Sequence, residues 1–217
     1  MSFEAKTHSD WEVKAYREIK SYVPPNKSVP IDVVPGVYEG GFQLWECTLD
    51  LLEFMESSID FNGKSVFELG CGRGLPAIYA ALHGATKVVL QDFNKEVIEE
   101  IAIPNTILNK CPEGVCEFSA DSWQDIPSKY PAQSFDVILA AETIYRKEQL
   151  SAFVQAFTHL VKPDGIVVVA AKRIYFGLSG SVLDLIELIE GKYTHQLKEY
   201  TGKSAYPHDV IVLKKIQ

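Results

Sequence analysis

The chain has 217 residues, 47% hydrophobic and 23% charged, so it can bury a sizeable core and is not a disordered or low-complexity protein. This length fits one α/β domain with a short appendage. The 21 lysines and arginines against 29 acidic residues give a net charge of −8. That charge disfavours nucleic acid and anionic membranes as partners and would attract a basic protein, although it is also an ordinary charge for solubility.

The four cysteines, Cys47, Cys71, Cys111 and Cys116, form no C-x-x-C pair and have no histidines at zinc-ligand spacing. We therefore expect neither disulfides nor a metal site. The first residues lack the apolar core of a signal peptide, and no run approaches the roughly 20 apolar residues of a membrane span. The sequence thus indicates a protein of reducing compartments, the cytoplasm and nucleus, with no membrane partner.

Residues 1–35 are expected to form an N-terminal helix and a proline-rich segment, followed by the main domain at residues 36–217. Apolar residues at helical spacing predict the helix over residues 10–22. The prolines of residues 24–35 then interrupt any regular element, which makes this stretch a linker or a lid over a site.

A helical pattern over residues 42–57 opens the main domain, and short apolar strands then alternate with helices. The predicted strands are 65–69, 87–91, 115–119, 135–141 and 165–171, and the predicted helices are 75–83, 95–109 and 148–161. This alternation predicts a doubly wound α/β fold, whose mostly parallel sheet has helices on both faces. A helix at 182–189 and two strands, 193–200 and 209–216, close the chain around a turn at 201–207. Two such closing strands are not typical of the dehydrogenase version of this sheet.

The first of these strands runs into Gly70, Gly72 and Gly74 at the start of the next helix. Glycines at such a place allow a tight turn and the close approach of a nucleotide-like ligand, although a purely structural turn is the alternative. A dinucleotide fingerprint would need a small residue where Leu75 stands, so NAD is disfavoured. Glu68, at the strand end, suits a cationic ligand such as S-adenosylmethionine.

Three further strand ends should converge on the same crevice. Asp92 ends the second strand, where a carboxylate can accept hydrogen bonds from both ribose hydroxyls or merely cap the next helix. After the third strand, Asp121 or the backbone beside it could bond the adenine amine, and Trp123 could face the ring or pack in the core. The fourth strand delivers Ala141, Glu142 and Tyr145.

These motifs resemble the seven-β-strand, class I S-adenosylmethionine-dependent methyltransferases and, within them, the histidine protein methyltransferases. The resemblance covers residues 35–193 and is most specific in three stretches: Gly36-Val-Tyr-Glu-Gly-Gly-Phe-Gln-Leu-Trp-Glu-Cys-Thr, Glu142-Thr-Ile-Tyr145 and Tyr175-Phe-Gly. It implies a Rossmann-like fold closed by the two final strands, S-adenosyl-L-methionine as cofactor, and protein histidine as acceptor. The sister protein-lysine enzymes carry D-x-x-Y where this chain has Glu142-Thr-Ile-Tyr145, which favours histidine.

The resemblance also assigns site roles, with the tryptophan that matches Trp45 closing over the cofactor. The predicted cofactor-binding residues are Trp45, Glu68, Gly70, Cys71, Gly72, Gly74, Asp92, Phe93, Asn94, Trp123 and Ala141. We predict that Glu142 accepts a hydrogen bond from the distal N–H of the substrate imidazole, and that Tyr145 walls the acceptor slot or donates to Glu142. Alternatively, Glu142 binds a backbone group or Lys172 and only shapes the pocket. The loop at Tyr175 is placed to contact a peptide, or is simply a connection.

Known members of the resembled family act on one histidine of large-subunit ribosomal protein number three, so that protein is the implied partner. They carry a long N-terminal extension, whereas about 35 residues precede the matched region here. Two alternatives stay open. One is a protein-lysine methyltransferase of the sister group. The other is a non-catalytic module that keeps the cofactor pocket and assists assembly of a nascent ribosomal protein.

Overall fold

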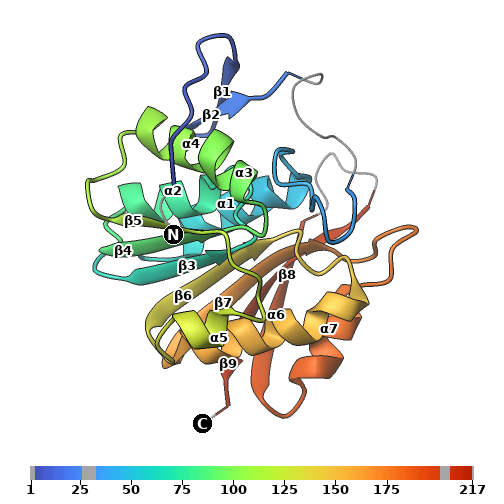
Figure 1. Cartoon of the computed structure of the whole chain (residues 1–217). Coiled ribbons are helices and arrows are strands. Elements are labelled where there is room, and N and C mark those ends of the chain that lie inside the picture. The colour runs from blue at the N-terminus through green and yellow to red at the C-terminus, as the bar shows by residue number, and fades with distance from the viewer. Residues whose placement is uncertain (1–2, 26–32, 201–205, 217) are drawn as a thin grey trace.

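The computed structural model describes residues 3–25, 33–200 and 206–216. Its body is a seven-stranded sheet in the order β5-β4-β3-β6-β7-β9-β8 (Figure 1). The strands of this sheet are β3 (Ser65–Leu69), β4 (Lys87–Gln91), β5 (Cys116–Ser119), β6 (Phe135–Ala141), β7 (Val161–Lys172), β8 (Tyr193–Tyr200) and β9 (His208–Lys215). Neighbouring strands from β5 to β7 are parallel, and β9 lies antiparallel to both β7 and β8. The predicted mostly parallel sheet with a C-terminal antiparallel strand is confirmed.

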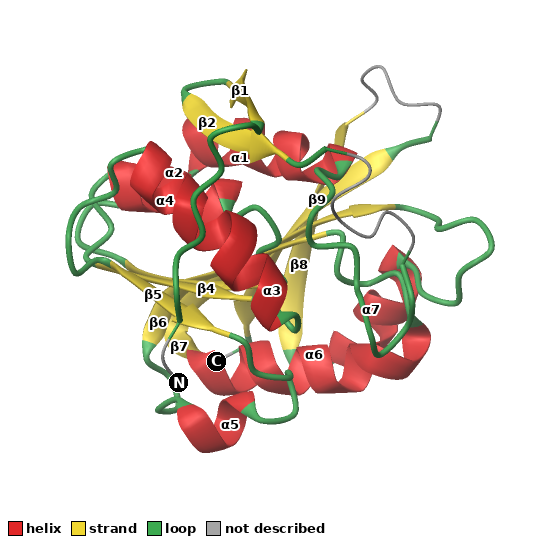
Figure 2. Ribbon diagram, turned by 45° about the horizontal axis from the view of Figure 1, so that its top comes forward, coloured by secondary structure: helices red, strands yellow, loops and turns green. Residues whose placement is uncertain are grey.

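Helices cover both faces of the sheet, as the turned view in Figure 2 shows. On one face lie α1 (Glu46–Ser58), α2 (Leu75–Leu82) and a continuous helical stretch made of α3 (Lys95–Val97), the π-helical turn η1 (Ile98–Ala102) and α4 (Ile103–Leu108). On the other lie α5 (Ile126–Lys129), α6 (Lys147–Leu160) and α7 (Val182–Ile189). Since successive strand residues point to opposite faces, Val66 packs under the first group of helices and Phe67 under the second.

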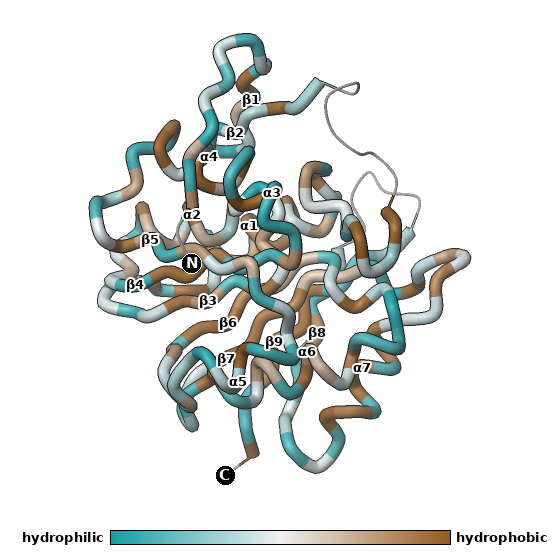
Figure 3. The backbone as a smooth tube through the Cα atoms, viewed as in Figure 1, coloured by the Kyte–Doolittle hydropathy of each residue, from teal (hydrophilic) through white to brown (hydrophobic). Residues whose placement is uncertain are grey.

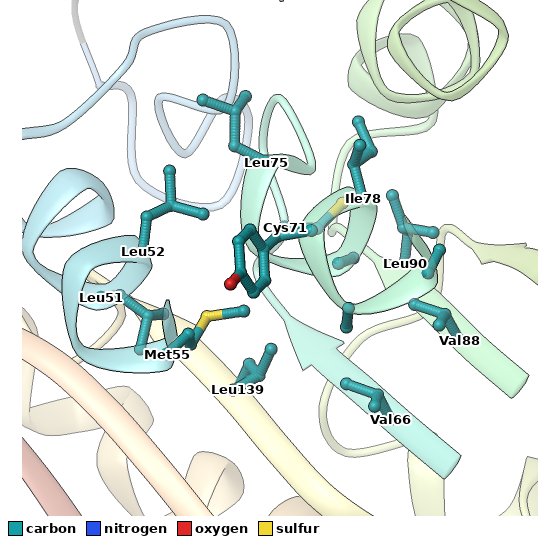
Figure 4. Packing of buried hydrophobic residues seen from close by; sticks show 14 of the residues in the cluster. Leu51, Leu52, Met55, Val66, Cys71, Leu75, Ile78, Val88, Leu90 and Leu139 are labelled. Carbon is teal, nitrogen blue, oxygen red and sulfur yellow. The ribbon is translucent and has the colours of Figure 1, made fainter. Parts of the chain in front are cut away.

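The apolar residues concentrate in the central strands (Figure 3). Figure 4 shows the cluster between α1, α2 and the sheet, where Leu51, Leu52 and Met55 of α1 are fully buried. Burial of each such side chain contributes roughly 1.5–3 kcal/mol to the free energy of folding. Among the described residues, no helix is both long and apolar enough to span a bilayer.

The predicted element boundaries agree closely with the structure in the main domain. Strands β3, β4 and β6 and helix α7 coincide with the predictions, and β7 begins earlier than predicted, at Val161. The predicted helix at 95–109 is the stretch from α3 to α4, with η1 in its middle. Most of the turn predicted at 201–207 lies outside the described residues.

The helix predicted over residues 10–22 is wrong, because this segment is a β-hairpin of β1 (Glu12–Tyr16) and β2 (Ile19–Val23). Arg17 adopts a left-handed backbone with φ of 56°, which reverses the chain within a tight turn. Ile19 and Ser21 are both fully buried, so the burial in β2 has the period of a strand.

The hairpin docks on α4 through two asparagine amides. Asn105 accepts a hydrogen bond from the backbone N–H of Tyr22 at 2.9 Å, and Asn109 bonds both the N–H and the carbonyl of Lys20, at 2.8 and 2.7 Å. Because these residues are one helical turn apart, their amides face the same strand and satisfy its free edge. In the predicted proline-rich segment, residues 26–32 lie outside the described part of the chain.

Candidate active site

A cavity opens at the carboxyl ends of β3, β4 and β6, and the predicted residues gather around it. The predicted residues that line it are Trp45, Glu68, Gly70, Cys71, Gly72, Gly74, Asp92, Phe93, Trp123, Ala141, Glu142 and Tyr145. Four strand ends were expected to share one crevice, and the convergence follows from the parallel order of the sheet. The individual roles of these residues toward a ligand stay predictions.

The glycine loop forms the floor of the cavity and holds its shape through the backbone. Gly72 has a φ of 49°, and a Cβ added there would lie 3.0 Å from the carbonyl oxygen of Gly41, so a side chain would press on the opposite wall. The side chain of Cys71 belongs to the apolar cluster around α2 (Figure 4), and burial raises the pKa of its thiol. We therefore expect the backbone of Cys71, and not its sulfur, to meet the ligand.

Asp92 follows β4 directly and is 5% exposed. Its Oδ2 accepts a hydrogen bond from the N–H of Gly72, and its Oδ1 accepts one from the N–H of Asn94, both at 3.0 Å. Burial raises the pKa of Asp92 to about 6, although these backbone hydrogen bonds counteract part of the shift. Because a carboxylate has about four acceptor positions, the fixed side chain can still accept two ribose hydroxyls.

Gln91, which the sequence did not single out, connects three parts of the cavity wall. Its Oε1 accepts hydrogen bonds from the N–H of Gly70 and from Nε1 of Trp123, both at 3.1 Å, and its Nε2 donates to the carbonyl of Asp121 at 2.7 Å. The Trp123 ring also packs 5.1 Å from the ring of Phe153. Trp123 is thus both a wall of the cavity and a member of the core.

The expectation for the Asp121 side chain is wrong. Its carboxylate accepts a hydrogen bond from Ser119 at 2.7 Å and pairs with Lys129, and these residues line a second cavity. Asp121 is therefore turned away from the main cavity, and its carbonyl is already bonded to Gln91. The sequence placed this residue correctly at a strand end but did not specify the direction of its side chain.

Glu68 lines the cavity and also caps a helix. Its Oε2 accepts a hydrogen bond from the N–H of Ala77 at 2.9 Å, in the first turn of α2, where the N-cap Gly74 has no side chain to do so. Burial raises the pKa of this carboxyl well above its usual range. We expect its other oxygen to be the atom that would face a cationic ligand.

Asn94, a predicted cofactor contact, is not part of the cavity wall. It accepts a hydrogen bond from the N–H of Glu39 at 3.1 Å and donates one to the carbonyl of Val37 at 2.6 Å. It therefore braces the segment of residues 36–45, which crosses the cavity and which we call the roof segment. The prediction for Asn94 rested on its place beside Asp92, and the backbone turn after Asp92 directs its side chain elsewhere.

The acceptor side of the cavity centres on Glu142, which is 7% exposed and has a left-handed backbone with φ of 56°. Such a conformation is uncommon for a residue with a side chain and points to a functional constraint. Its Oε1 accepts no hydrogen bond from any residue in the described part of the chain. Lys172 Nζ lies 3.9 Å from this oxygen, too far for a hydrogen bond.

Two more side chains face the Glu142 carboxylate. Burial, and after it the negative charge of Glu142, raises the pKa of both the Cys47 thiol and the Tyr175 phenol. Both groups therefore stay protonated and neutral. Tyr175 is buried, whereas the next residue, Phe176, is 68% exposed, so this loop has one aromatic ring at the site and one on the surface.

Tyr145 lines the cavity, and its predicted role at the acceptor slot stays a prediction, but it does not donate to Glu142. Its hydroxyl donates to Oε2 of Glu39 instead. Burial, followed by this hydrogen bond, raises the pKa of the phenol, so Tyr145 remains a donor at neutral pH. Glu39 is a second residue that the sequence did not single out, although it belongs to the stretch that carried the family resemblance.

One cluster in the structure resembles a metal site. Cys47, Asp50 and His208 bring a sulfur, a carboxylate oxygen and a ring nitrogen within 4.8 Å of one another. However, His208 Nδ1 and Asp50 Oδ2 lie 2.6 Å apart, a direct hydrogen bond that ties β9 to α1 and accounts for this arrangement without an ion. The expectation of no metal stays a prediction.

The donor half of the cavity fits S-adenosyl-L-methionine. The glycine loop allows close approach, Asp92 keeps acceptor positions for a ribose, and a buried glutamate lines the wall. The orphan oxygen of Glu142 marks the opposite half, where an acceptor group would enter. The sequence predicted that these residues would share one crevice, and a methyl transfer site requires a donor half and an acceptor half in one cavity.

Comparison with known proteins gives a consistent result. A family model described as "Lysine methyltransferase" matches residues 36–179. The Histidine protein methyltransferase 1 homolog of Dictyostelium discoideum is 36% identical over 160 residues, which cover 73% of this chain and 52% of that protein. Protein N-lysine methyltransferase METTL21A of Danio rerio is 32% identical over 136 residues, which cover 61% of each protein.

Among solved structures, the N-methyltransferase NodS from Bradyrhizobium japonicum, in complex with S-adenosyl-L-homocysteine, matches with a TM-score of 0.62 at 19% identity, over 77% of this chain and 85% of that chain. This likeness confirms the class I fold. The chain spans about half the length of the histidine protein methyltransferases that it matches. The predicted resemblance and the predicted cofactor are confirmed at the level of the family. The chain belongs to the S-adenosylmethionine-dependent methyltransferase family whose model is described as "Lysine methyltransferase", and its relatives include proteins named histidine protein methyltransferases.

Proposed function

We propose that this protein is an S-adenosylmethionine-dependent protein-histidine N-methyltransferase whose substrate is a histidine of a large-subunit ribosomal protein. The observation that carries the proposal is the buried Glu142 carboxylate, which lines the acceptor end of the cavity with an oxygen unpartnered among the described residues. Relatives named histidine protein methyltransferases, 30–36% identical over about 70% or more of this chain, support histidine as the acceptor.

The chemistry of imidazole suits this carboxylate. A neutral imidazole nitrogen is already nucleophilic near pH 7, so the site needs no strong base before attack. The distal N–H of the ring then needs an acceptor that fixes its tautomer, and Oε1 of Glu142 would provide one. A lysine acceptor would instead arrive as an ammonium and would first have to lose a proton.

The bound cofactor supplies an electrophilic methyl group on a sulfonium. An imidazole nitrogen held in line with this methyl group would form the new N–C bond as the S–C bond breaks, and the S–C electron pair would go to sulfur. The imidazole becomes an imidazolium, whose positive charge Glu142 stabilises, and the distal proton is later lost to solvent. Tyr145 walls the slot, the buried Tyr175 packs near Glu142, and both help to exclude water, while Asp92 and the glycine loop would hold the donor in line.

The ribosomal partner agrees with the charge of the chain. A net charge of −8 favours association with a basic protein, and ribosomal proteins are commonly basic. Such a substrate would be met in the cytoplasm and the nucleus, where ribosomal proteins are made and assembled. We include these locations in the proposal.

The test is to incubate the full chain with isotope-labelled S-adenosylmethionine and purified large-subunit ribosomal protein number three. Hydrolysis and mass spectrometry would then identify the labelled amino acid. We expect N-methylhistidine, and no label with the Gly72→Arg variant, whose side chain would fill the donor site. Methyl-lysine would overturn the histidine assignment. If the purified ribosomal protein stays unlabelled, while the same assay on a mixture of other proteins labels a histidine, the ribosomal partner would be overturned.

A further inference from the structure

The roof segment, residues 36–45, connects the donor and acceptor halves of the cavity. Gly41 lies against the donor half, where an added Cβ would come 3.2 Å from Oδ2 of Asp92 and 2.8 Å from the Val97 side chain. Trp45 ends the segment, lines the cavity and donates from Nε1 to the carbonyl of Gly40 at 3.1 Å. The segment is therefore packed onto the donor residues and braced by its own tryptophan.

The side chain of Glu39 reaches from the roof segment to the acceptor side. Its Oε2 accepts a hydrogen bond from the Tyr145 hydroxyl, and its Oε1 pairs with Nη1 of Arg146 at 3.0 Å. Oε1 also accepts the N–H of Gly36 at 2.8 Å, within the roof segment itself. The side chains of Glu39 and Arg146 are 14% and 21% exposed, so water weakens this ion pair less than it weakens a surface pair.

The two ends of this connection belong to different functions. Tyr145 and Arg146 directly follow the strand end that carries Glu142, whereas the roof segment covers Asp92 and the glycine loop. Asn94 holds the roof segment from the donor side through the backbone of Val37 and Glu39. Among the described residues, the Glu39 side chain is thus the polar contact that ties the roof segment to the acceptor loop.

We propose that Glu39 is a positioning residue that latches the roof segment to Tyr145 and Arg146, and that the latch must open for the methyl donor or its demethylated product to leave. With the latch closed, Tyr145 is held at the acceptor slot and the roof segment stays over the donor. When it opens, both are released together. The inference rests on donor binding and does not depend on which amino acid is methylated.

The test measures dissociation of radiolabelled S-adenosylhomocysteine from the full chain after a chase with unlabelled compound. Because this charge-assisted hydrogen bond is partly exposed, its loss should have a moderate effect, and we expect Glu39→Gln and Arg146→Gln each to speed dissociation roughly tenfold. Tyr145→Phe, which removes one arm of the latch, should have a smaller effect in the same direction. The Glu39→Gln/Arg146→Gln double variant should dissociate no faster than either single variant, because both remove the same contact.

Glu148→Gln is the matched control, since this carboxylate lies two residues beyond Arg146 and bonds Ser179 outside the cavity. Its dissociation rate should stay within about twofold of the wild type. Thermal unfolding of each variant separates a latch from a general loss of structure, and Arg146→Gln serves if Glu39→Gln does not fold.

Three outcomes would overturn the proposal. The first is an unchanged dissociation rate in Glu39→Gln. The second is additive effects in the double variant. The third is a fast rate in Glu39→Gln with normal rates in both Arg146→Gln and Tyr145→Phe, which would mean that Glu39 acts on the donor without either latch partner. A wild-type chain that binds no S-adenosylhomocysteine would instead contradict the cofactor assignment.

Discussion

Replacing Glu142 by glutamine removes one negative charge from the acceptor slot and keeps the shape of the side chain. A carboxylate about 4 Å from the developing imidazolium stabilises it by about 4 kcal/mol at an effective dielectric constant of 20. The glutamine carbonyl keeps a neutral hydrogen bond of about 1 kcal/mol. The difference, about 3 kcal/mol, predicts a fall in kcat of roughly a hundredfold or somewhat more.

The substitution also removes one of the two carboxylates close to Lys172. Its Nζ lies 3.9 Å from Glu142 Oε1 and 3.8 Å from Glu46 Oε2, so it keeps one carboxylate neighbour in the variant. Glu46→Gln is therefore a matched control, because it removes a charge at the same distance from Lys172, on a side chain that is 60% exposed and lies outside the cavity wall. Its kcat should stay within about threefold of the wild type.

The assay is single-turnover methylation of the protein substrate, with S-adenosylhomocysteine affinity measured in parallel. We expect Glu142→Gln to lose turnover while its affinity for S-adenosylhomocysteine stays within about twofold, because the donor half is unchanged. Near-normal turnover in Glu142→Gln and in Glu142→Ala would refute the reasoning and leave Glu142 as a residue that only shapes the pocket. Equal losses in Glu142→Gln and Glu46→Gln would also refute it, since they would report on Lys172.

Three further changes test the donor half and the fold. Burial raises the pKa of Asp92 to about 6, so its carboxylate should become protonated as the pH falls below neutrality. Calorimetry should then show that S-adenosylhomocysteine binds roughly fourfold more weakly at pH 5.5 than at pH 7.5. The Asp92→Asn variant should lose this pH dependence. In urea denaturation, Gly74→Ala should lower the free energy of unfolding by about 2–4 kcal/mol, because φ is +74° and the new Cβ would lie 2.6 Å from a leucine side chain of β4. The control is Gly63→Ala, which has a similar φ of +70° but open space around it and should cost about 1 kcal/mol. Asn105→Ala should cost about 2–3 kcal/mol in the same assay because it leaves buried groups without partners, and Asn109→Ala, at a half-buried residue, should cost about 1 kcal/mol or less.

The sequence predicted the main sheet and most of the cavity wall because both follow from short-range patterns. Strand periodicity located the ends of β3, β4 and β6, and the geometry of a parallel sheet brings such ends together. The N-terminal hairpin was missed because its apolar residues fit a helical period as well as an alternating one. What decides for a hairpin is the left-handed turn at Arg17 and the hydrogen bonds from β2 to the asparagines of the α4 segment. These contacts exist only in the folded chain.

The missed and misplaced site residues have a common cause. Glu39 and Tyr145 are 106 positions apart in the sequence, and Gln91 and Trp123 are 32 positions apart. No local sequence pattern can therefore predict either contact. Asn94 was predicted from its position beside Asp92 but does not line the cavity, because its side-chain direction depends on a turn that the sequence does not specify. Patterns within one element therefore predicted which backbone reaches the site, whereas the side-chain partners required the folded chain.

The amide of Asn105 has a practical consequence for handling this protein. It bonds Tyr22 and Ser21 of the terminal hairpin on one side and the carbonyl of Arg73, within the glycine loop, on the other. A shortened chain that begins after residue 25, made to aid expression, would lack the hairpin partners of this amide. The Asn105 side chain would then no longer be held in place on the hairpin side. The affinity of a truncated chain for S-adenosylhomocysteine should therefore be compared with that of the intact chain before the truncated chain is used in its place.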